Sequence, residues 1–209
     1  MFFMKNAFLQ NFYRSGVRVI VKLFYRCDFI GFENIPENGS AIIIANHISF
    51  MDGLLINAAA KRHVRFIIDE EIYKQPIVNY FMKMDEAIPV RPQKNSVKEM
   101  LETTHKALNN GELVAIFPEG MITYTGNLNR FKFGIEWIVQ QNDVPVIPIA
   151  IIGMWGSSFS RKYVGKWYRF LPRKFRMKVK LICGKPIPHN KAKVSYLQKE
   201  MMKLISENV

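Results

Sequence analysis

Cysteine is scarce in this chain, which has two cysteines among 209 residues, Cys27 and Cys183. A pair so far apart in sequence forms neither a disulfide framework nor a Cys-x-x-Cys metal site, and it favours a reducing compartment. The histidines His63, His105 and His189 lack HExxH or Cys/His ligand spacing, so we expect no metal ion. GxGxxG, GxxxxGKS/T and GxSxG patterns are absent as well, which argues against the usual phosphate-binding loops and a serine-hydrolase elbow.

Long apolar runs are also missing. The longest uncharged stretch beside the candidate catalytic segments, residues 144–160, contains two prolines and is shorter than the roughly 20 residues that a membrane span needs. Near the N-terminus, the charges of Arg14, Arg18 and Lys22 recur every four residues, which interrupts any apolar core of a secretory signal. We therefore expect a peripheral or monotopic protein.

Acidic residues are few and unevenly placed. The whole chain has 30 Lys and Arg against 17 Asp and Glu, a net charge of +13. Residues 1–27 hold five bases and residues 144–199 hold 13, both without an acid, whereas residues 28–143 hold 11 bases and 15 acids. Such an excess suggests a polyanionic partner, either nucleic acid or an anionic membrane. With 49% apolar and 22% charged residues, the composition is that of a globular protein.

The N-terminal basic segment has a helical period. On a helical wheel, its polar side chains fall within an arc of about 120°. These side chains are Asn11, Arg14, Ser15, Arg18, Lys22 and Arg26. The wide apolar remainder predicts an amphipathic helix in a membrane interface over residues 1–27, with its basic stripe against anionic headgroups, ahead of a globular domain over residues 28–209. The same pattern also fits a helix docked on the protein's own core.

Short uninterrupted apolar runs, typical of strands covered on both faces, alternate with helical patterns. The runs are residues 41–45, 64–68, 87–90, 113–117, 146–152 and 179–183. The helical patterns are residues 53–60, 71–84, 96–109, 133–141 and 194–206. This alternation predicts an α/β fold with a mostly parallel sheet flanked by helices, in which the active site gathers at the carboxyl ends of strands.

Residues with catalytic chemistry follow the first apolar run. His47 and Asp52 are five positions apart, so on one continuous helix they would lie about 140° from each other. They can meet only if His47 lies in the turn before a helix, with Ser49 as the N-cap and Asp52 in the first turn. The carboxylate would then hold the imidazole tautomer and stabilise its charged form. Residues 49–52 also fit a plain helix cap.

Two further strand ends carry candidate binding residues. Glu119 and Gly120 follow the run at residues 113–117, and a glycine there lets a backbone amide approach a ligand closely. Arg91 lies between two prolines, and an arginine held in this way can bind a phosphate through two parallel hydrogen bonds. Each segment taken alone also fits an ordinary turn or a surface arginine.

Together these segments resemble the glycerolipid acyltransferase family, which contains 1-acylglycerol-3-phosphate and lysophospholipid acyltransferases. Four blocks match in order: the HxxxxD block from Asn46 and His47 to Asp52, residues 88–91, residues 117–120 with Gly126, and residues 144–148. The resemblance spans roughly residues 30–190. It implies a glycerol-phosphate-acyltransferase-like fold and an acyltransferase domain over residues 28–209.

The resemblance implies that His47 is the general base and Asp52 its orienting partner. It assigns Arg91, Glu119 and Gly120 to binding of the glycerol phosphate. It implies no cofactor, because acyl-CoA or acyl-carrier protein serves as a co-substrate. It also implies a role in phospholipid biosynthesis at the cytoplasmic face of a membrane, with a lysophospholipid as the second substrate.

One segment departs from the family pattern. Members that form phosphatidic acid commonly carry Thr-Arg after the Glu-Gly pair, where this chain has Met121 and Ile122. Residues 122–126 are more similar to bacterial domains that reacylate lysophospholipids such as 2-acylglycerophosphoethanolamine. The family as a whole implies a lysophospholipid or 1-acylglycerol-3-phosphate as the acceptor, and this segment argues against 1-acylglycerol-3-phosphate.

The expected mechanism is direct transfer, in which His47 takes the proton of a glycerol hydroxyl and the resulting alkoxide attacks the thioester. Asp52 stabilises the imidazolium, and Arg91 together with Lys132 neutralises the phosphate of the acceptor. No activated serine or cysteine is apparent, so no acyl-enzyme is required.

Two other functions are compatible with the sequence. Residues 161–185 interleave ten bases with aromatic residues, a mixture typical of nucleic-acid binding and equally of a lipid headgroup interface. The aromatic residues are Tyr163, Trp167, Tyr168, Phe170 and Phe175. The membrane is the expected partner, and nucleic acid is not. A hydrolase that uses water in place of the acceptor hydroxyl would employ the same His47 and Asp52.

Overall fold

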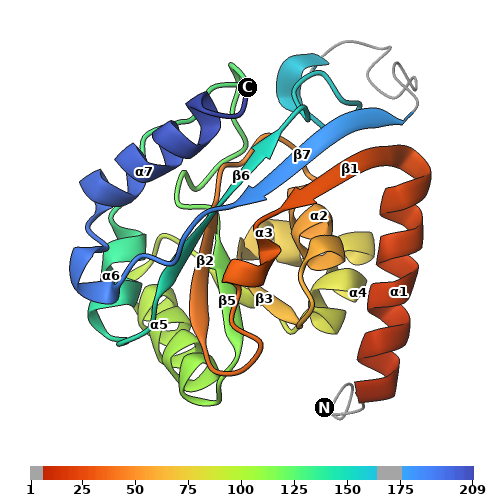
Figure 1. Ribbon diagram of the computed structural model, residues 1–209. Helices are drawn as coiled ribbons and strands as arrows, with labels where there is room; N and C mark the ends of the chain where they lie inside the picture. The colour runs from red at the N-terminus through yellow and green to blue at the C-terminus, as the bar shows by residue number, and fades with distance from the viewer. Residues whose placement is uncertain (1–6, 164–175) are drawn as a thin grey trace.

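The computed structural model describes residues 7–163 and 176–209, which contain a seven-stranded sheet (Figure 1). The strands are β1 (Tyr25–Ile30), β2 (Ala41–Ala45), β3 (Val64–Asp69), β4 (Ile88–Val90), β5 (Leu113–Ile116), β6 (Val146–Ile152) and β7 (Met177–Cys183). Their order is β1-β7-β6-β2-β5-β3-β4, and every neighbouring pair is parallel except β6 with β7. The carboxyl end of β2 therefore lies between those of β5 and β6.

Helices cover both faces of the sheet (Figure 1). They are α1 (Ala7–Phe24), α2 (Asp52–Ala59), α3 (Glu70–Tyr73), α4 (Pro76–Met84), α5 (Lys94–Asn109), α6 (Gly134–Gln140) and α7 (Val194–Ser206). One buried apolar cluster joins α1 and α2 to the sheet, and a second joins α5, α6 and α7 to the opposite face. Since alternate side chains of β2 belong to the two clusters, this strand is buried on both faces.

The predicted α/β fold with a mostly parallel, helix-flanked sheet is confirmed, and each of the six predicted strands is present. The seventh strand, β1, was not predicted. It lies at the sheet edge beside β7 and carries polar side chains, so it lacks the uninterrupted apolar run of a central strand. The helix predicted over residues 1–27 ends at Phe24, and its last residues belong to β1.

The single helix predicted over residues 71–84 is two helices. α3 ends at Tyr73, and α4 begins at Pro76. Gln75 between them has an extended backbone, as expected for a residue that precedes proline. Proline then fits the first position of α4, where no backbone donor is needed.

Helix α1 docks on the protein through its basic stripe. The guanidinium of Arg14 donates to the carbonyls of Ala60 and Lys61, and that of Arg18 donates to the carbonyls of Ala58 and Ala60. These carbonyls form the end of α2, where unpaired acceptors and the helix dipole favour a cation. The prediction that this stripe faces lipid headgroups is therefore wrong for Arg14 and Arg18.

The outward face of α1 is apolar. Its exposed large side chains are Phe12, Val19, Ile20, Leu23 and Phe24. Val17 and Val21, on the docked side, are buried in the core. Among residues 7–163 and 176–209, no helix is long and apolar enough to cross a membrane.

Candidate active site

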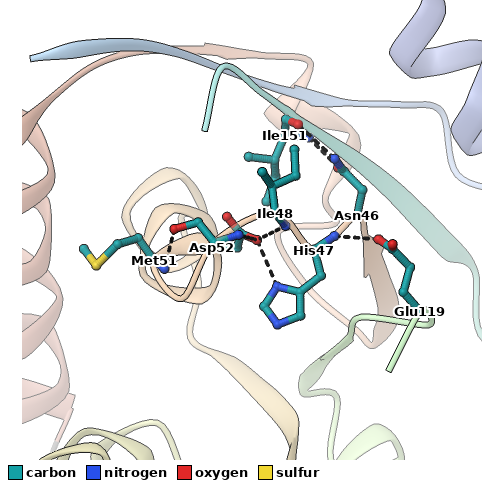
Figure 2. A network of polar contacts seen from close by, with 8 residues as sticks. Asn46, His47, Ile48, Met51, Asp52, Glu119 and Ile151 are labelled. Atoms are coloured by element: carbon teal, nitrogen blue, oxygen red, sulfur yellow. Dashed lines mark hydrogen bonds and ion pairs between the residues drawn. The ribbon is translucent and has the colours of Figure 1, made fainter. Parts of the chain in front are cut away.

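The turn after β2 brings His47 and Asp52 together (Figure 2). The His47 Nδ1 lies 2.9 Å from the Asp52 Oδ2. α2 begins at Asp52, so the histidine lies in the turn and the aspartate in the first turn of the helix, as the spacing predicted. The predicted N-cap is wrong: Met51 is the N-cap, and the Ser49 hydroxyl accepts a bond from the Met51 amide inside the turn.

The Asp52 carboxylate organises the whole turn. Besides the imidazole, its Oδ2 accepts hydrogen bonds from the backbone amides of Ile48 at 2.7 Å and Ser49 at 2.8 Å. Its side chain is fully buried, and its Oδ1 has no hydrogen-bond partner among the described residues. Three protein donors on one oxygen fix the carboxylate, and they fix the imidazole with it.

The His47 ring presents one nitrogen outward. Its plane stacks on Phe117 from the end of β5, with ring centroids 4.0 Å apart and an interplanar angle of 12°. Because Nδ1 is bound to Asp52, Nε2 lies on the far side of the ring, and the side chain keeps 19% of its surface exposed. A neutral imidazole that donates from Nδ1 to the carboxylate has an unprotonated Nε2, which suits proton abstraction.

The backbone of His47 is held by the turn that follows β5. The His47 amide donates to the Glu119 Oε1 at 2.7 Å, and the His47 carbonyl accepts from the Thr123 amide at 2.8 Å. The second oxygen of Glu119 accepts from the Asn129 amide at 2.7 Å. The segment that contains Glu119 and Thr123 therefore fixes the backbone of His47. Figure 2 shows the contact with Glu119.

The observed contacts of Glu119 are with the protein's own backbone, and its role in phosphate binding stays a prediction. The side chain is 2% exposed, and burial raises the pKa of its carboxyl, while the bonds from Asn129 and His47 oppose that rise. Each carboxylate oxygen accepts from a backbone amide, so Glu119 helps to fix the backbone of His47.

Gly120 leaves space for the side chain of Lys132. Its backbone has a φ of +68°, which favours glycine, and a Cβ at this position would lie 2.6 Å from the Lys132 Nζ. The Lys132 side chain therefore lies across the Glu119-Gly120 turn, where its exposed ammonium has no acidic partner among the described residues. The structure brings Lys132 beside the segment that holds His47.

Arg91 also lies at the carboxyl ends of the parallel strands, but it follows the outermost strand, β4. Its guanidinium contacts both carboxylate oxygens of Glu70. Among the described residues, no hydrogen bond or ion pair links Arg91 to His47 or Asp52. The structure thus brings His47, Asp52, Glu119, Gly120 and Lys132 together and places Arg91 in a separate pair with Glu70.

Sequence reasoning missed several supporting residues. The Asn46 side chain exchanges two hydrogen bonds with the backbone of Ile151 on β6, at 2.9 and 2.7 Å. Phe117 and Thr123 fix the ring and the carbonyl of His47. Asn46 and Phe117 stand inside matched sequence blocks, but nothing in the spacing indicates which atoms they would contact.

The remaining candidates are only partly described. No group of three metal-ligating side chains occurs within residues 7–163 and 176–209. Four aromatic residues of the basic segment, Trp167, Tyr168, Phe170 and Phe175, lie outside the described residues. Before that gap, the Arg161 guanidinium lies 4.4 Å from the centre of the Tyr124 ring.

Comparison with known proteins identifies relatives of this chain. The family model described as acyltransferase matches residues 26–152. A chloroplastic 1-acyl-sn-glycerol-3-phosphate acyltransferase of Brassica napus is 30% identical over 132 residues, which are 62% of this chain and 38% of that protein. The 1-acyl-sn-glycerol-3-phosphate acyltransferase of Bacillus subtilis is 25% identical over 180 residues, 86% of this chain and 82% of that protein.

A solved structure shows the same fold. The 1-acyl-sn-glycerophosphate acyltransferase PlsC of Thermotoga maritima aligns with a TM-score of 0.72 and 24% identity, covering 99% of this chain and 84% of that chain. The chain spans about two fifths of the length of the first curated relatives that it matches. The resemblance predicted from four sequence blocks is confirmed, because the family model covers more than half of the chain. The chain belongs to the acyltransferase family.

Proposed function

We propose that this protein moves a fatty acyl group from acyl-CoA or acyl-carrier protein to a hydroxyl of a lysophospholipid, with 1-acyl-sn-glycerol-3-phosphate as the leading acceptor. The observation that carries the proposal is the buried Asp52 that orients His47 and leaves its Nε2 facing outward. The names of the relatives from Brassica napus and Bacillus subtilis support this acceptor.

His47 acts as the general base. Its Nε2 takes the proton of the acceptor hydroxyl, and the oxygen attacks the thioester carbonyl of the acyl donor. The tetrahedral intermediate then collapses, the thiolate leaves, and the imidazolium returns the proton to that sulfur. Asp52 stabilises the imidazolium and keeps Nδ1 protonated throughout.

Transfer proceeds without an acyl-enzyme. Burial raises the pKa of the Cys27 thiol to about 11 and that of the Cys183 thiol to about 12. Both cysteines are therefore protonated near neutral pH and are poor nucleophiles. The acceptor hydroxyl, activated by His47, is the nucleophile that the site supports.

Lys132 and Arg91 bind the phosphate of the acceptor in this proposal. Lys132 lies across the turn that holds His47, so it is the cation closer to the reacting hydroxyl. Gly120 provides the space for the Lys132 side chain. Ile122 stands where phosphatidic-acid-forming members commonly carry the arginine of the Thr-Arg pair, so this chain has no cation at that position.

The protein works at the cytoplasmic face of an anionic membrane in this proposal. The exposed apolar face of α1 enters the interface, while Arg14 and Arg18 hold the helix on α2. Lys22, exposed at the last turn of α1, is left to meet lipid headgroups. Such a helix lies in the plane of the interface.

The test is a product analysis with mixed lysolipids, comparing acyl-CoA with acyl-carrier protein as the donor. Diacyl phospholipid formed from 1-acyl-sn-glycerol-3-phosphate in preference to other lysolipids is the expected result. Another lysolipid as the preferred acceptor would overturn the choice of acceptor. Fatty acid released without diacyl product would mean that water replaces the acceptor and that the protein is a hydrolase.

A further inference from the structure

The loop that follows β6 places an indole ring against a glycine of the candidate site. Gly126 has a φ of +86°, which favours glycine. A Cβ at this position would lie between 2.7 and 2.9 Å from three ring atoms of Trp155, closer than non-bonded carbon atoms pack. Trp155 is half-buried and packs against the apolar cluster that joins α1 and α2 to the sheet. The absence of a side chain at Gly126 therefore lets the indole lie directly on the backbone.

The backbone under the indole forms one compact turn. The buried Thr123 hydroxyl accepts hydrogen bonds from the amides of Thr125 and Gly126, both at 3.2 Å. The Thr123 amide donates to the His47 carbonyl at 2.8 Å. Two hydrogen bonds therefore connect Gly126, on which the indole lies, to the backbone of His47.

The same loop also contacts the turn that follows β2. Ser160 and Ser49 form an isolated antiparallel bridge, and the Phe50 amide donates to the Phe159 carbonyl at 3.2 Å. The Ser49 amide is one of the donors to the Asp52 Oδ2. The buried Ser160 hydroxyl makes two hydrogen bonds within the loop, at 3.1 and 2.9 Å. The loop after β6 thus touches both segments that orient the imidazole.

We propose that Trp155 is a positioning residue for the general base: its indole holds the turn at residues 123–126, and that turn holds the carbonyl of His47. This inference rests on the proposed function, in which His47 removes the proton of the acceptor hydroxyl. Trp155 acts through the backbone of Gly126 and Thr123. A displaced base reacts slowly even when the substrate is bound, so Trp155 should affect kcat more than KM.

The first test replaces the indole. Trp155→Ala removes the ring from the turn, and we expect kcat to fall about 10-fold to 100-fold while the acceptor KM stays within about twofold of wild type. Trp155→Phe keeps a flat ring and should recover kcat to within about threefold of wild type. Both are assayed well below the Tm of each variant.

Met201→Ala is the control for lost core packing. Met201 is fully buried on α7, in the cluster at the opposite face of the sheet. Its variant should lower the Tm at least as far as Trp155→Ala does, because it leaves a cavity, but it should keep the kcat of wild type. Equal kcat values for Met201→Ala and Trp155→Ala would overturn the role of Trp155.

The second test asks whether the contact with Gly126 transmits the effect. Gly126→Ala presses a methyl group against the indole and should also lower kcat. In the Trp155→Ala background the ring is gone, so the same change should lower kcat by less than about threefold. Gly39→Ala, at a positive φ with open space, should leave kcat at the wild-type value. Losses that multiply in the double variant would show that the two residues act independently, which would overturn the proposal.

The ring resonance of His47, observed by NMR without substrates, separates this inference from the proposed function. It is assigned by its loss in His47→Ala. The resonance should shift in Trp155→Ala and stay at the wild-type position in Met201→Ala. This pattern with no acyl transfer by wild type would overturn the proposed function and leave the positioning role intact. Active wild type, with kcat and the resonance both unchanged in Trp155→Ala, would overturn the positioning role alone.

Discussion

At the scale of single residues, His47 is fixed at three points. Asp52 holds its ring nitrogen, Glu119 holds its amide, and Thr123 holds its carbonyl. A general base must lie within hydrogen-bond reach of the proton it removes, so small displacements of the ring lower the rate. The residues around His47 are therefore expected to affect turnover more than substrate binding.

Glu119→Gln tests this expectation. The amide keeps one acceptor oxygen but places an NH₂ group against the His47 or the Asn129 amide, so one of the two bonds is lost. We expect kcat to fall about 10-fold to 100-fold, with the acceptor KM within twofold of wild type. Glu102→Gln, on the exposed face of α5, is the control. A raised acceptor KM with unchanged kcat would instead support a role of Glu119 in binding the glycerol phosphate.

Gly120→Ala tests the position of Lys132. Gly39 also has a positive φ, of +81°, but has open space at its Cβ position, so Gly39→Ala is a matched control. Both variants should lower the free energy of unfolding by about 1–2 kcal/mol, measured with denaturant. Only Gly120→Ala should raise the acceptor KM, because its methyl group displaces Lys132. Equal KM values for the two variants would contradict the proposed role of Lys132.

At the scale of elements, α2 connects the candidate site to α1. Asp52 is its first residue, and the carbonyls at its other end are bound by Arg14 and Arg18. The helix that is proposed to enter the membrane interface is thus joined to the helix that orients His47.

Arg18→Glu is expected to weaken the contact between α1 and α2. It replaces two hydrogen bonds to the end of α2 with a negative charge near unpaired carbonyls, which costs about 1–3 kcal/mol. The Tm should fall by several degrees, and turnover of detergent-dispersed substrate should fall with it. Lys22→Glu, exposed on the same helix, should leave both values near wild type. Equal Tm values for the two variants would show that Arg18 does not support α2.

The contact of α1 with α4 should depend on pH through Asp85, which follows α4. The carboxylate accepts hydrogen bonds from Tyr13 and Asn57, and burial raises its pKa to about 7 from 3.8. Because the folded state holds this proton more tightly than the unfolded chain, stability should fall as pH rises from about 4 to about 7. The slope reaches at most about 1.4 kcal/mol per pH unit. Asp85→Asn should flatten the curve of unfolding free energy against pH, and an unchanged slope would contradict this assignment.

The sequence allowed the central elements to be predicted because buried parallel strands are uninterrupted apolar runs. β1 could not be found in this way, since an edge strand with exposed polar positions resembles a loop. The spacing of His47 and Asp52 predicted their contact, because only one local geometry joins them. The bond from the His47 amide to Glu119 and the Glu70 contact to Arg91 depend on which strands are neighbours, and spacing along the chain does not encode that.

At the scale of the whole molecule, charge and apolar surface are arranged around a mixed-charge centre. Residues 1–27 and 144–199 hold 18 bases and no acid, and the rest of the chain lowers the net charge to +13. Two of the N-terminal bases, Arg14 and Arg18, bind α2, so they are unavailable to lipid headgroups. The apolar side chains on the outer face of α1 therefore carry more of the proposed membrane binding than the charge count suggests.

Leu23→Glu tests whether the apolar outer face of α1 binds the membrane. Leu23 is 57% exposed on α1, and Met202, 56% exposed on α7, offers a matched control in Met202→Glu. Leu23→Glu should weaken sedimentation with anionic vesicles about 10-fold, because it removes apolar area that the membrane interface would bury and adds charge repulsion. Its Tm should stay near wild type, since the side chain faces outward. Equal vesicle binding by the two variants would contradict the proposed orientation.

The role of His47 as general base is tested by the rate of phospholipid formation in His47→Ala. Wild type and variant would be compared by mass spectrometry in the same mixed micelles, with His189→Ala, which alters an exposed histidine, as the control. If His47 is the general base, His47→Ala loses about 10²-fold to 10⁴-fold in kcat at an unchanged Tm, whereas His189→Ala retains wild-type turnover. Acyl transfer by His47→Ala at the wild-type rate would rule out His47 as the general base.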